Sequence, residues 1–212
     1  MKPKIIKVCG LRDGANIRRV EQLAPDWMGF ICWSGSARHV GEVPTYMPSA
    51  CRRVGVFVNA TPDFILQRTA SLGLHILQFH GQESPGFCHM IREKAKERGH
   101  KVEIMKAFPV KAGEAFPDTR AYESCCDYFL FDTYTARMGG SGRTFDWGRL
   151  GDYQGNTPFL LSGGIGPEHL DALRRMDLPR CVGVDLNSRF EVGPALKDVQ
   201  RLESFIRALR ES

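Results

Sequence analysis

Short apolar runs, rich in β-branched and aromatic residues, alternate with longer stretches of mixed polarity along the whole chain. Such runs, bounded by turn signals, are typical of strands buried on both faces of a parallel sheet. On this basis we predict eight strands, at residues 4–9, 27–32, 53–58, 75–79, 102–107, 127–132, 158–162 and 181–186.

The intervals between these strands carry amphipathic patterns that predict helices. They lie near residues 14–24, 44–50, 61–72, 84–98, 112–123, 146–152, 166–176 and 195–210. Thr61-Pro62 and Ser84-Pro85 each combine an N-cap side chain with a proline at the first helical position. The second and fifth stretches have the weakest patterns, and Pro117 interrupts the fifth.

Strand followed by helix, repeated eight times in 212 residues, predicts the α/β class and a single-domain (β/α)8 TIM barrel over residues 1–212. A doubly wound open sheet is the alternative. Both architectures use buried parallel strands, so periodicity does not separate them. No linker, low-complexity tract or charge run divides the chain.

The composition indicates a globular protein with a sizeable core, since 42% of residues are hydrophobic and 25% are charged. The net charge of +5 is spread along the chain, and no Lys/Arg block is interleaved with aromatic residues. We therefore expect no nucleic-acid partner, whereas a small anionic substrate suits the charge. The N-terminus lacks a signal-peptide core and no apolar run would cross a bilayer, so we expect no membrane association.

Seven cysteines, an odd number without CxxC spacing, indicate free thiols in a reducing compartment and no structural zinc. We expect a cytoplasmic protein that is a monomer or a homodimer. The adjacent Cys125 and Cys126 are either a redox pair or two ordinary thiols. We favour ordinary thiols because disulfides are rare in the cytosol.

Polar and glycine-rich residues cluster at the C-terminal ends of the predicted strands, where barrel enzymes carry their active sites. These residues are Cys9-Gly10, Asn59, His80-Gly81, Asp132-Thr133, Ser162-Gly163-Gly164 and Asp185 to Ser188. Packing does not require polar residues at the same end of several strands. The coincidence predicts an active site at this end of the barrel.

The first strand carries the pattern that singles out Cys9. Ile5, Lys7 and Cys9 share one face by the alternation of a strand, which places Lys7 one layer beneath the thiol. A neighbouring cation favours the thiolate, so we expect Lys7 to lower the thiol pKa. If strand eight closes on strand one, we expect Asp185 to pair with Lys7. A small core residue is the competing interpretation of Cys9.

Two glycine-rich stretches predict loops that contact a substrate. Residues 162–169 (SGGIGPEH) expose backbone N–H groups before a predicted helix and favour a phosphate, with Asn187 and Ser188 as further donors. A tight turn is the alternative. Residues 139–147 (GGSGRTFDW) lack a helical pattern and predict a flexible lid that holds Arg143 near the mouth.

Three further side chains have two interpretations each. His80 is a substrate contact or only a structural hydrogen-bonding residue. Arg38 clamps a carboxylate through two parallel hydrogen bonds, or it is a solvated loop residue. Trp33 lines the pocket or serves packing alone.

Several motifs, in this order along the chain, resemble those of the phosphoribosylanthranilate isomerase family of tryptophan biosynthesis. They are KVCGLRD, GFICWSGSARHV, VGVFVN, LQFHGQE, LFDT…GGSGRTFDW, LLSGGI and GVDLNS…E…P…KD. The resemblance implies that Cys9 is the general base, Asp132 the general acid and Arg38 the partner of the anthranilate carboxylate. It also implies phosphate binding by Gly163, Gly164, Asn187 and Ser188.

The implied substrate is a small phosphosugar derivative of anthranilate. The implied reaction is the Amadori rearrangement of N-(5′-phosphoribosyl)anthranilate to 1-(2-carboxyphenylamino)-1-deoxyribulose 5-phosphate, which needs no metal, nucleotide or redox cofactor. The chain departs from the family pattern at Arg12, Arg189 and around Cys32.

Two other functions stay open from the sequence. A histidine-pathway aldose isomerase is expected to have carboxylates at both catalytic strand ends, which Cys9 argues against. A phosphosugar-binding or thiol-sensing barrel without catalysis would keep the phosphate loops and tolerate loss of Asp132.

Overall fold

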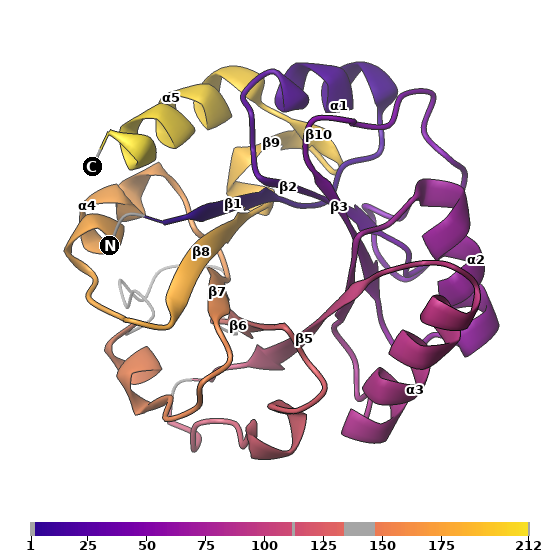
Figure 1. Cartoon of the computed structure of the whole chain (residues 1–212). Coiled ribbons are helices and arrows are strands. Elements are labelled where there is room, and N and C mark those ends of the chain that lie inside the picture. The colour runs from indigo at the N-terminus through magenta and orange to yellow at the C-terminus, as the bar shows by residue number, and fades with distance from the viewer. Residues whose placement is uncertain (1–2, 112, 134–146, 212) are drawn as a thin grey trace.

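Eight parallel strands close into a barrel in the computed structural model, which describes residues 3–111, 113–133 and 147–211. The strands are β1 (Ile5–Val8), β2 (Trp27–Ile31), β3 (Arg52–Phe57), β4 (Ile76–Phe79), β5 (Glu103–Pro109), β6 (Tyr128–Asp132), β7 (Phe159–Ser162) and β8 (Cys181–Leu186). They follow one another around the barrel in chain order (Figure 1), and β8 pairs with β1. All eight predicted strands are confirmed, and the open sheet is excluded.

Helices surround the barrel (Figure 1). They are α1 (Gly14–Glu21), α2 (Pro62–Leu72), α3 (Pro85–Glu97), α4 (Leu170–Arg175) and α5 (Val199–Arg210). The expected N-caps are present, because the side chains of Thr61 and Ser84 accept hydrogen bonds from the first turns of α2 and α3. None of the described helices has the length and apolarity that a membrane span requires.

Three predicted helices are wrong or reduced. Residues 44–50 form no helix, because Pro48 interrupts the segment and Glu21 Oε1 accepts the backbone N–H groups of Ser49 and Ala50. Of residues 112–123, only the 3-10 turn η1 (Arg120–Tyr122) is helical among those described. The stretch at 146–152 contains the 3-10 helix η2 (Trp147–Asp152).

The segment after β8 also differs from the prediction. It contains the 3-10 turn η4 (Ser188–Phe190) and a two-stranded antiparallel sheet of β9 (Glu191–Gly193) and β10 (Leu196–Lys197), before α5 begins. Asn16 holds the hairpin against α1, since its side chain pairs with both the N–H and the carbonyl of Lys197. Similarly, 3-10 turn η3 (Pro167–His169) precedes the short α4.

Alternation along the strands divides the core into two layers. The inner layer fills the barrel and consists of Trp27, Val54, Ile76, Met105, Ala107, Leu130 and Leu160, with Ile5, Tyr128 and Val182 packed against it. A larger outer layer, which includes Ile6 and Val8, lies between the strands and the helices. The predicted orientation of β1 is therefore confirmed, and it directs Lys7 toward the barrel interior.

Candidate active site

Cys9 lies directly after β1 and is 3% exposed. Its backbone N–H donates to the carbonyl of Leu186 at 2.9 Å, which ties it to the end of β8. Gly29 of β2 makes room for the sulfur, because a Cβ at Gly29 would lie 2.7 Å from Cys9 Sγ. The backbone of three neighbouring strands thus fixes the position of the thiol.

Lys7 is fully buried beneath this thiol. Its Nζ lies 3.0 Å from Asp185 Oδ1, in agreement with the expected pairing, and the two residues are register partners in β1 and β8. Burial disfavours the ammonium charge, but Asp185 and Cys9 outweigh it and raise the pKa of Lys7 above its ordinary value. A permanent cation therefore lies below Cys9.

Lys7 lowers the thiol pKa as expected, but the net pKa of Cys9 is raised and not lowered. Burial raises the pKa of Cys9 above its ordinary value, since the charges of Lys7 and Lys197 oppose burial while Asp185 adds to it. Because Lys7 is also paired with Asp185, it offsets only part of the rise in the thiol pKa that burial causes. The consequence is a less abundant thiolate that is a stronger base.

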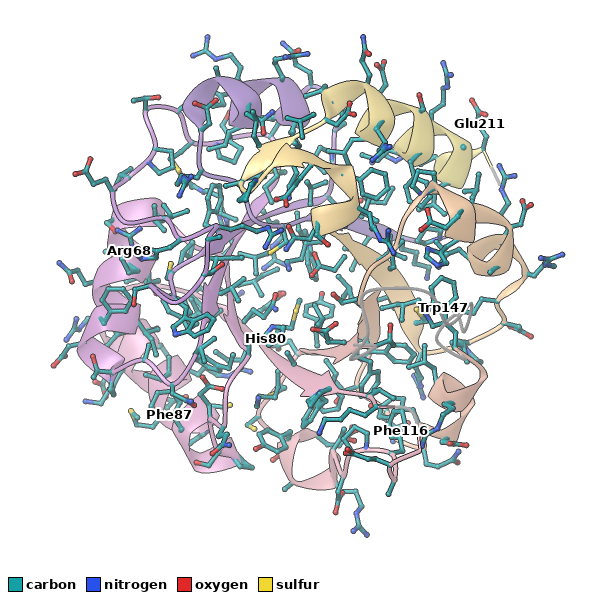
Figure 2. The ribbon with its side chains drawn as sticks, turned by 180° about the vertical axis from the view of Figure 1, so that it is seen from behind. Arg68, His80, Phe87, Phe116, Trp147 and Glu211 are labelled. Atoms are coloured by element: carbon teal, nitrogen blue, oxygen red, sulfur yellow. The ribbon has the colours of Figure 1, made fainter. Side chains whose placement is uncertain are left out.

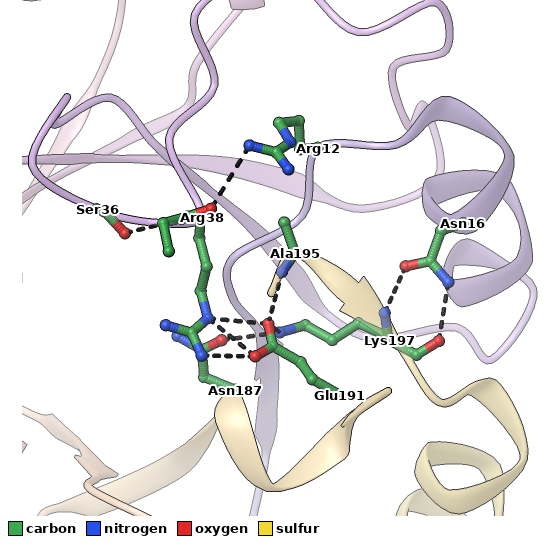
Figure 3. A network of polar contacts seen from close by, with 9 residues as sticks. Arg12, Asn16, Ser36, Arg38, Asn187, Glu191, Ala195 and Lys197 are labelled. Carbon is green, nitrogen blue, oxygen red and sulfur yellow. Dashed lines mark hydrogen bonds and ion pairs between the residues drawn. The ribbon is translucent and has the colours of Figure 1, made fainter. Parts of the chain in front are cut away.

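A chain of ion pairs runs from Arg38 into the β9–β10 hairpin (Figure 3). Arg38 Nε donates to Glu191 Oε1 and Oε2 at 2.9 and 3.0 Å, and Arg38 Nη2 donates to Oε2 at 2.6 Å. Lys197 Nζ bridges Glu191 Oε1 at 2.7 Å and Asn187 Oδ1 at 2.8 Å. Burial alone would raise the pKa of Glu191, but Arg38 and Lys197 hold it below its ordinary value.

Gly10 allows this network to approach the thiol. Its φ of +76° lies in the left-handed region that favours glycine. A Cβ there would lie 2.7 Å from both Arg38 Cδ and Asn187 Oδ1. The residue next to Cys9 is therefore packed directly against two predicted substrate-binding residues.

His80 and Asp132 form the opposite side of the site. His80 Nε2 lies 3.4 Å from Asp132 Oδ2, and the two side chains are 37% and 25% exposed. Gln78 Nε2 lies 3.1 Å from His80 Nδ1, so a second side chain holds the imidazole ring. Figure 2 places His80 toward the centre of the molecule, whereas Arg68 and Glu211 lie at its edge.

Asp185 connects the two sides. It pairs with Lys7 beneath Cys9, accepts a hydrogen bond from Ser162 Oγ at 3.4 Å, and interacts electrostatically with both His80 and Asp132. The predicted base and acid are therefore linked through one buried carboxyl group, although they belong to strands on different parts of the barrel.

The predicted phosphate residues follow β7 and β8. Gly163 and Gly164 have φ values of +102° and +64°, a turn that other residues adopt only with strain. A Cβ at Gly163 would collide with the backbone of Thr133, so this loop lies directly against the end of β6. Ser188 is exposed, while the Asn187 side chain faces Lys197.

Two predictions, the lid that holds Arg143 and the pocket residue Trp33, have no structural support among the described residues. Arg143 and most of the predicted lid over 139–147 lie outside the described residues. Trp33 is 45% exposed and packs on its own loop, because a Cβ at Gly35 would lie 2.4 Å from the Trp33 ring.

Sequence reasoning assigned no role to Glu191 and Lys197. Both appear in the motif GVDLNS…E…P…KD, but no periodicity placed them near Arg38. Only the β9–β10 hairpin brings them there. Among the described residues, the one set of His, Cys, Asp or Glu side chains close enough to share a metal ion is Cys88, Cys125 and Cys126, in the outer core layer.

Comparisons with known proteins show which sequences this chain is similar to. The family model for N-(5'phosphoribosyl)anthranilate (PRA) isomerase matches residues 6–208. A protein of Parabacteroides distasonis named N-(5'-phosphoribosyl)anthranilate isomerase is 46% identical over 211 residues, covering 97% of this chain and 93% of the relative. The protein of the same name from Phocaeicola vulgatus is 45% identical over 207 residues and covers 98% of both chains.

Solved structures give the same result. Phosphoribosyl anthranilate isomerase from Thermotoga maritima superposes with a TM-score of 0.77 at 28% identity, covering 98% of this chain and 99% of that one. Another phosphoribosyl anthranilate isomerase, in complex with reduced 1-(o-carboxyphenylamino)-1-deoxyribulose 5-phosphate, has a TM-score of 0.72 at 25% identity and covers 98% and 99%.

Proposed function

This chain belongs to the N-(5'-phosphoribosyl)anthranilate isomerase family, and we propose that it performs the family's reaction with Cys9 as general base and Asp132 as general acid. It is an intramolecular isomerase that converts N-(5′-phosphoribosyl)anthranilate to 1-(2-carboxyphenylamino)-1-deoxyribulose 5-phosphate in tryptophan biosynthesis. The observation that carries the assignment of roles is the placement of Cys9 above the Lys7–Asp185 ion pair, with Asp132 across the same strand ends.

The first step is opening of the sugar ring. Asp132, protonated, donates to the ribose ring oxygen, and the C1′–O bond breaks as the nitrogen lone pair forms a protonated Schiff base. His80 Nε2, 3.4 Å from Asp132 Oδ2, supports this role because it orients the carboxyl group.

The second step is removal of the C2′ proton. The Cys9 thiolate takes that proton, the C1′–C2′ double bond forms, and the electron pair of the C=N bond returns to nitrogen. The enolamine then tautomerises to the ketone. A thiolate with a raised pKa is a strong base, which suits abstraction of a carbon-bound proton.

Arg38 binds the anthranilate carboxylate in this scheme. Glu191 occupies the Nε and Nη2 side of the guanidinium, which leaves Nη1 and the second Nη2 hydrogen for another carboxylate. Glu191 therefore acts as a positioning residue that fixes the direction of the fork. Lys197 holds Glu191 from the opposite side.

The phosphate group binds the loops after β7 and β8, through backbone groups of Gly163 and Gly164 and the side chains of Asn187 and Ser188. The positive φ angles of the two glycines and the exposure of Ser188 support this placement. His80 and Arg143 complete the set of substrate contacts that we propose. We also propose a cytoplasmic location, since all seven cysteines are free thiols.

Fluorescence of the anthranilate group provides a direct test. Purified protein mixed with N-(5′-phosphoribosyl)anthranilate should consume the substrate's fluorescence, while Cys9→Ser and Asp132→Asn variants should not do so at a comparable rate. If either variant keeps near-normal kcat, the corresponding role is wrong. A histidine-pathway activity is disfavoured, because the first strand ends in a thiol where that chemistry calls for a carboxylate.

A further inference from the structure

Three cysteines outside the active site converge in the outer core layer. Cys88 belongs to α3, and Cys125 and Cys126 lie between η1 and β6, so a helix and a distant loop supply the set. The three sulfur atoms all lie within 4.8 Å of one another, and those of Cys125 and Cys126 are 3.9 Å apart. All three residues are buried, with Cys88 at 0% and Cys126 at 8% exposure.

The spacing of the sulfurs fits one metal ion. An ion at the centre of three thiolates, with metal–sulfur bonds of about 2.3 Å, places the sulfurs about 4.0 Å apart. The observed separations need only small side-chain adjustments to reach this value. No disulfide joins any pair among the three thiols.

Two cations lie near the cluster, and each also pairs with a carboxylate. Arg92 Nη2 donates to the carbonyl of Cys125 at 2.8 Å, which places a guanidinium beside the cluster. Lys106 is close enough to Cys88 to interact with it electrostatically, and its Nζ lies 3.6 Å from Glu83 Oε2. The thiolate is the form that binds metals, and Arg92 and Lys106 offset part of its charge.

The ligand set also selects the kind of metal. Zinc in structural sites takes four ligands, and the nearby carboxylate of Glu83 already accepts the backbone N–H groups of Asn59 and Gly81 at 2.7 and 2.9 Å. Lys106 Nζ is likewise engaged by the carbonyls of Gly81 and Ala107. Three sulfur ligands suit a soft ion of low coordination number, copper(I) above all.

We propose that Cys88, Cys125 and Cys126 form a three-thiolate binding site for copper(I), separate from the isomerase site. Each thiol that coordinates the ion releases its proton to solvent, and the copper keeps its oxidation state. The site joins α3 to the loop before β6, so the bound ion cross-links two elements of the outer layer.

Anaerobic titration with copper(I) against a chromogenic copper(I) chelator tests the proposal. The whole protein should bind one tight equivalent per chain, and X-ray absorption of that form should give three sulfur neighbours at about 2.3 Å. Cys126→Ser should weaken binding by at least about 100-fold, because residues that only support a ligand already change metal affinity by 10–100-fold. Cys51→Ser, which removes a thiol outside the cluster, should bind copper(I) like the unmodified protein.

Activity distinguishes this site from Cys9. The first equivalent of copper(I) should leave the isomerase rate unchanged, whereas copper bound at Cys9 would abolish it. Absence of a tight equivalent, fewer than three sulfur neighbours, or equal weakening by Cys51→Ser would overturn the proposal. If Cys126→Ser does not fold, the sulfur count of the unmodified protein decides. The copper(I) titration and the sulfur count do not depend on whether the catalytic assignment holds.

Discussion

The two sides of the barrel mouth hold their functional groups in different ways. On the β1–β8 side, Cys9, Lys7 and Asp185 are each less than a tenth exposed, and Lys7 and Asp185 form an ion pair of 3.0 Å. On the β4–β6 side, His80 and Asp132 are 37% and 25% exposed and share one contact of 3.4 Å.

On the base side the fold itself provides the electrostatic environment, whereas on the acid side substrate binding must complete it. The charges around the base, Cys9, are fixed before any ligand binds. Burial in this environment raises the pKa of the Cys9 thiol. The acid keeps part of its contact with water. We therefore expect substitutions on the base side to change the rate of the chemical step, because they alter charges that are already in place around Cys9. Substitutions on the acid side affect Asp132, a group that substrate binding must first remove from water.

The sharpest test of the base side is Cys9→Ser. An alcohol ionises far less readily than a thiol, so we expect kcat to fall by about 10²–10⁴-fold with KM nearly unchanged, the range that general base catalysis contributes. Steady-state kinetics by substrate fluorescence measure both constants. Cys51→Ser is the control and should keep the normal rate. Retention of kcat in Cys9→Ser would return this residue to a packing role.

On the acid side, Asp132→Asn should lower kcat by about 10²-fold, because the amide does not donate an ionisable proton to the ring oxygen. Asp127→Asn is the matched control at the other end of β6, where the carboxylate pairs with Arg92. We expect it to change stability more than kcat. Equal losses of kcat in the two variants would mean that Asp132 acts through structure alone.

The variant Lys7→Met tests whether the buried cation beneath Cys9 changes the pKa of the thiol. Because Lys7 opposes the effect of burial, its removal should raise the pKa of Cys9 further. The limb of the kcat/KM profile that reports the thiol should therefore move to higher pH, with a loss of rate near neutral pH.

The single variant also leaves Asp185 buried without its partner, which costs about 3–5 kcal/mol of stability. The double variant Lys7→Met/Asp185→Asn removes both charges and serves as its companion. A profile that stays in place in every folded Lys7 variant would show that the cation does not act on the thiol.

The smallest expected effect concerns Glu191→Gln, which leaves Arg38 with a neutral partner. Loss of a charged hydrogen-bonding partner is worth about 1.5–3 kcal/mol when complete, so we expect KM to rise by about 10-fold with kcat preserved. Arg38→Ala should raise KM more, and Arg38→Lys should restore only part of the affinity. Glu103→Gln, which weakens the exposed pair with Arg52, is the control and should change neither constant. A fall in kcat without a change in KM would contradict the positioning role.

Much of this arrangement followed from the sequence by itself. Alternation of apolar runs predicted eight strands, and parity along β1 placed Lys7 inside the barrel beneath Cys9. These inferences succeed because side chains alternate strictly along a strand and because the ends of parallel strands meet on one side of a barrel. The motifs that end those strands carried the resemblance to the family, which the comparisons confirm.

Other features depended on the tertiary structure. The segment at 44–50 has a helix-like pattern, yet its backbone N–H groups bond to Glu21, a partner distant in sequence. The β9–β10 hairpin is too short to produce a periodic signal, and it alone brings Glu191 and Lys197 to Arg38. Desolvation of Cys9 reversed the direction of its pKa shift, because burial is a property of the packed barrel and not of neighbouring residues in the chain.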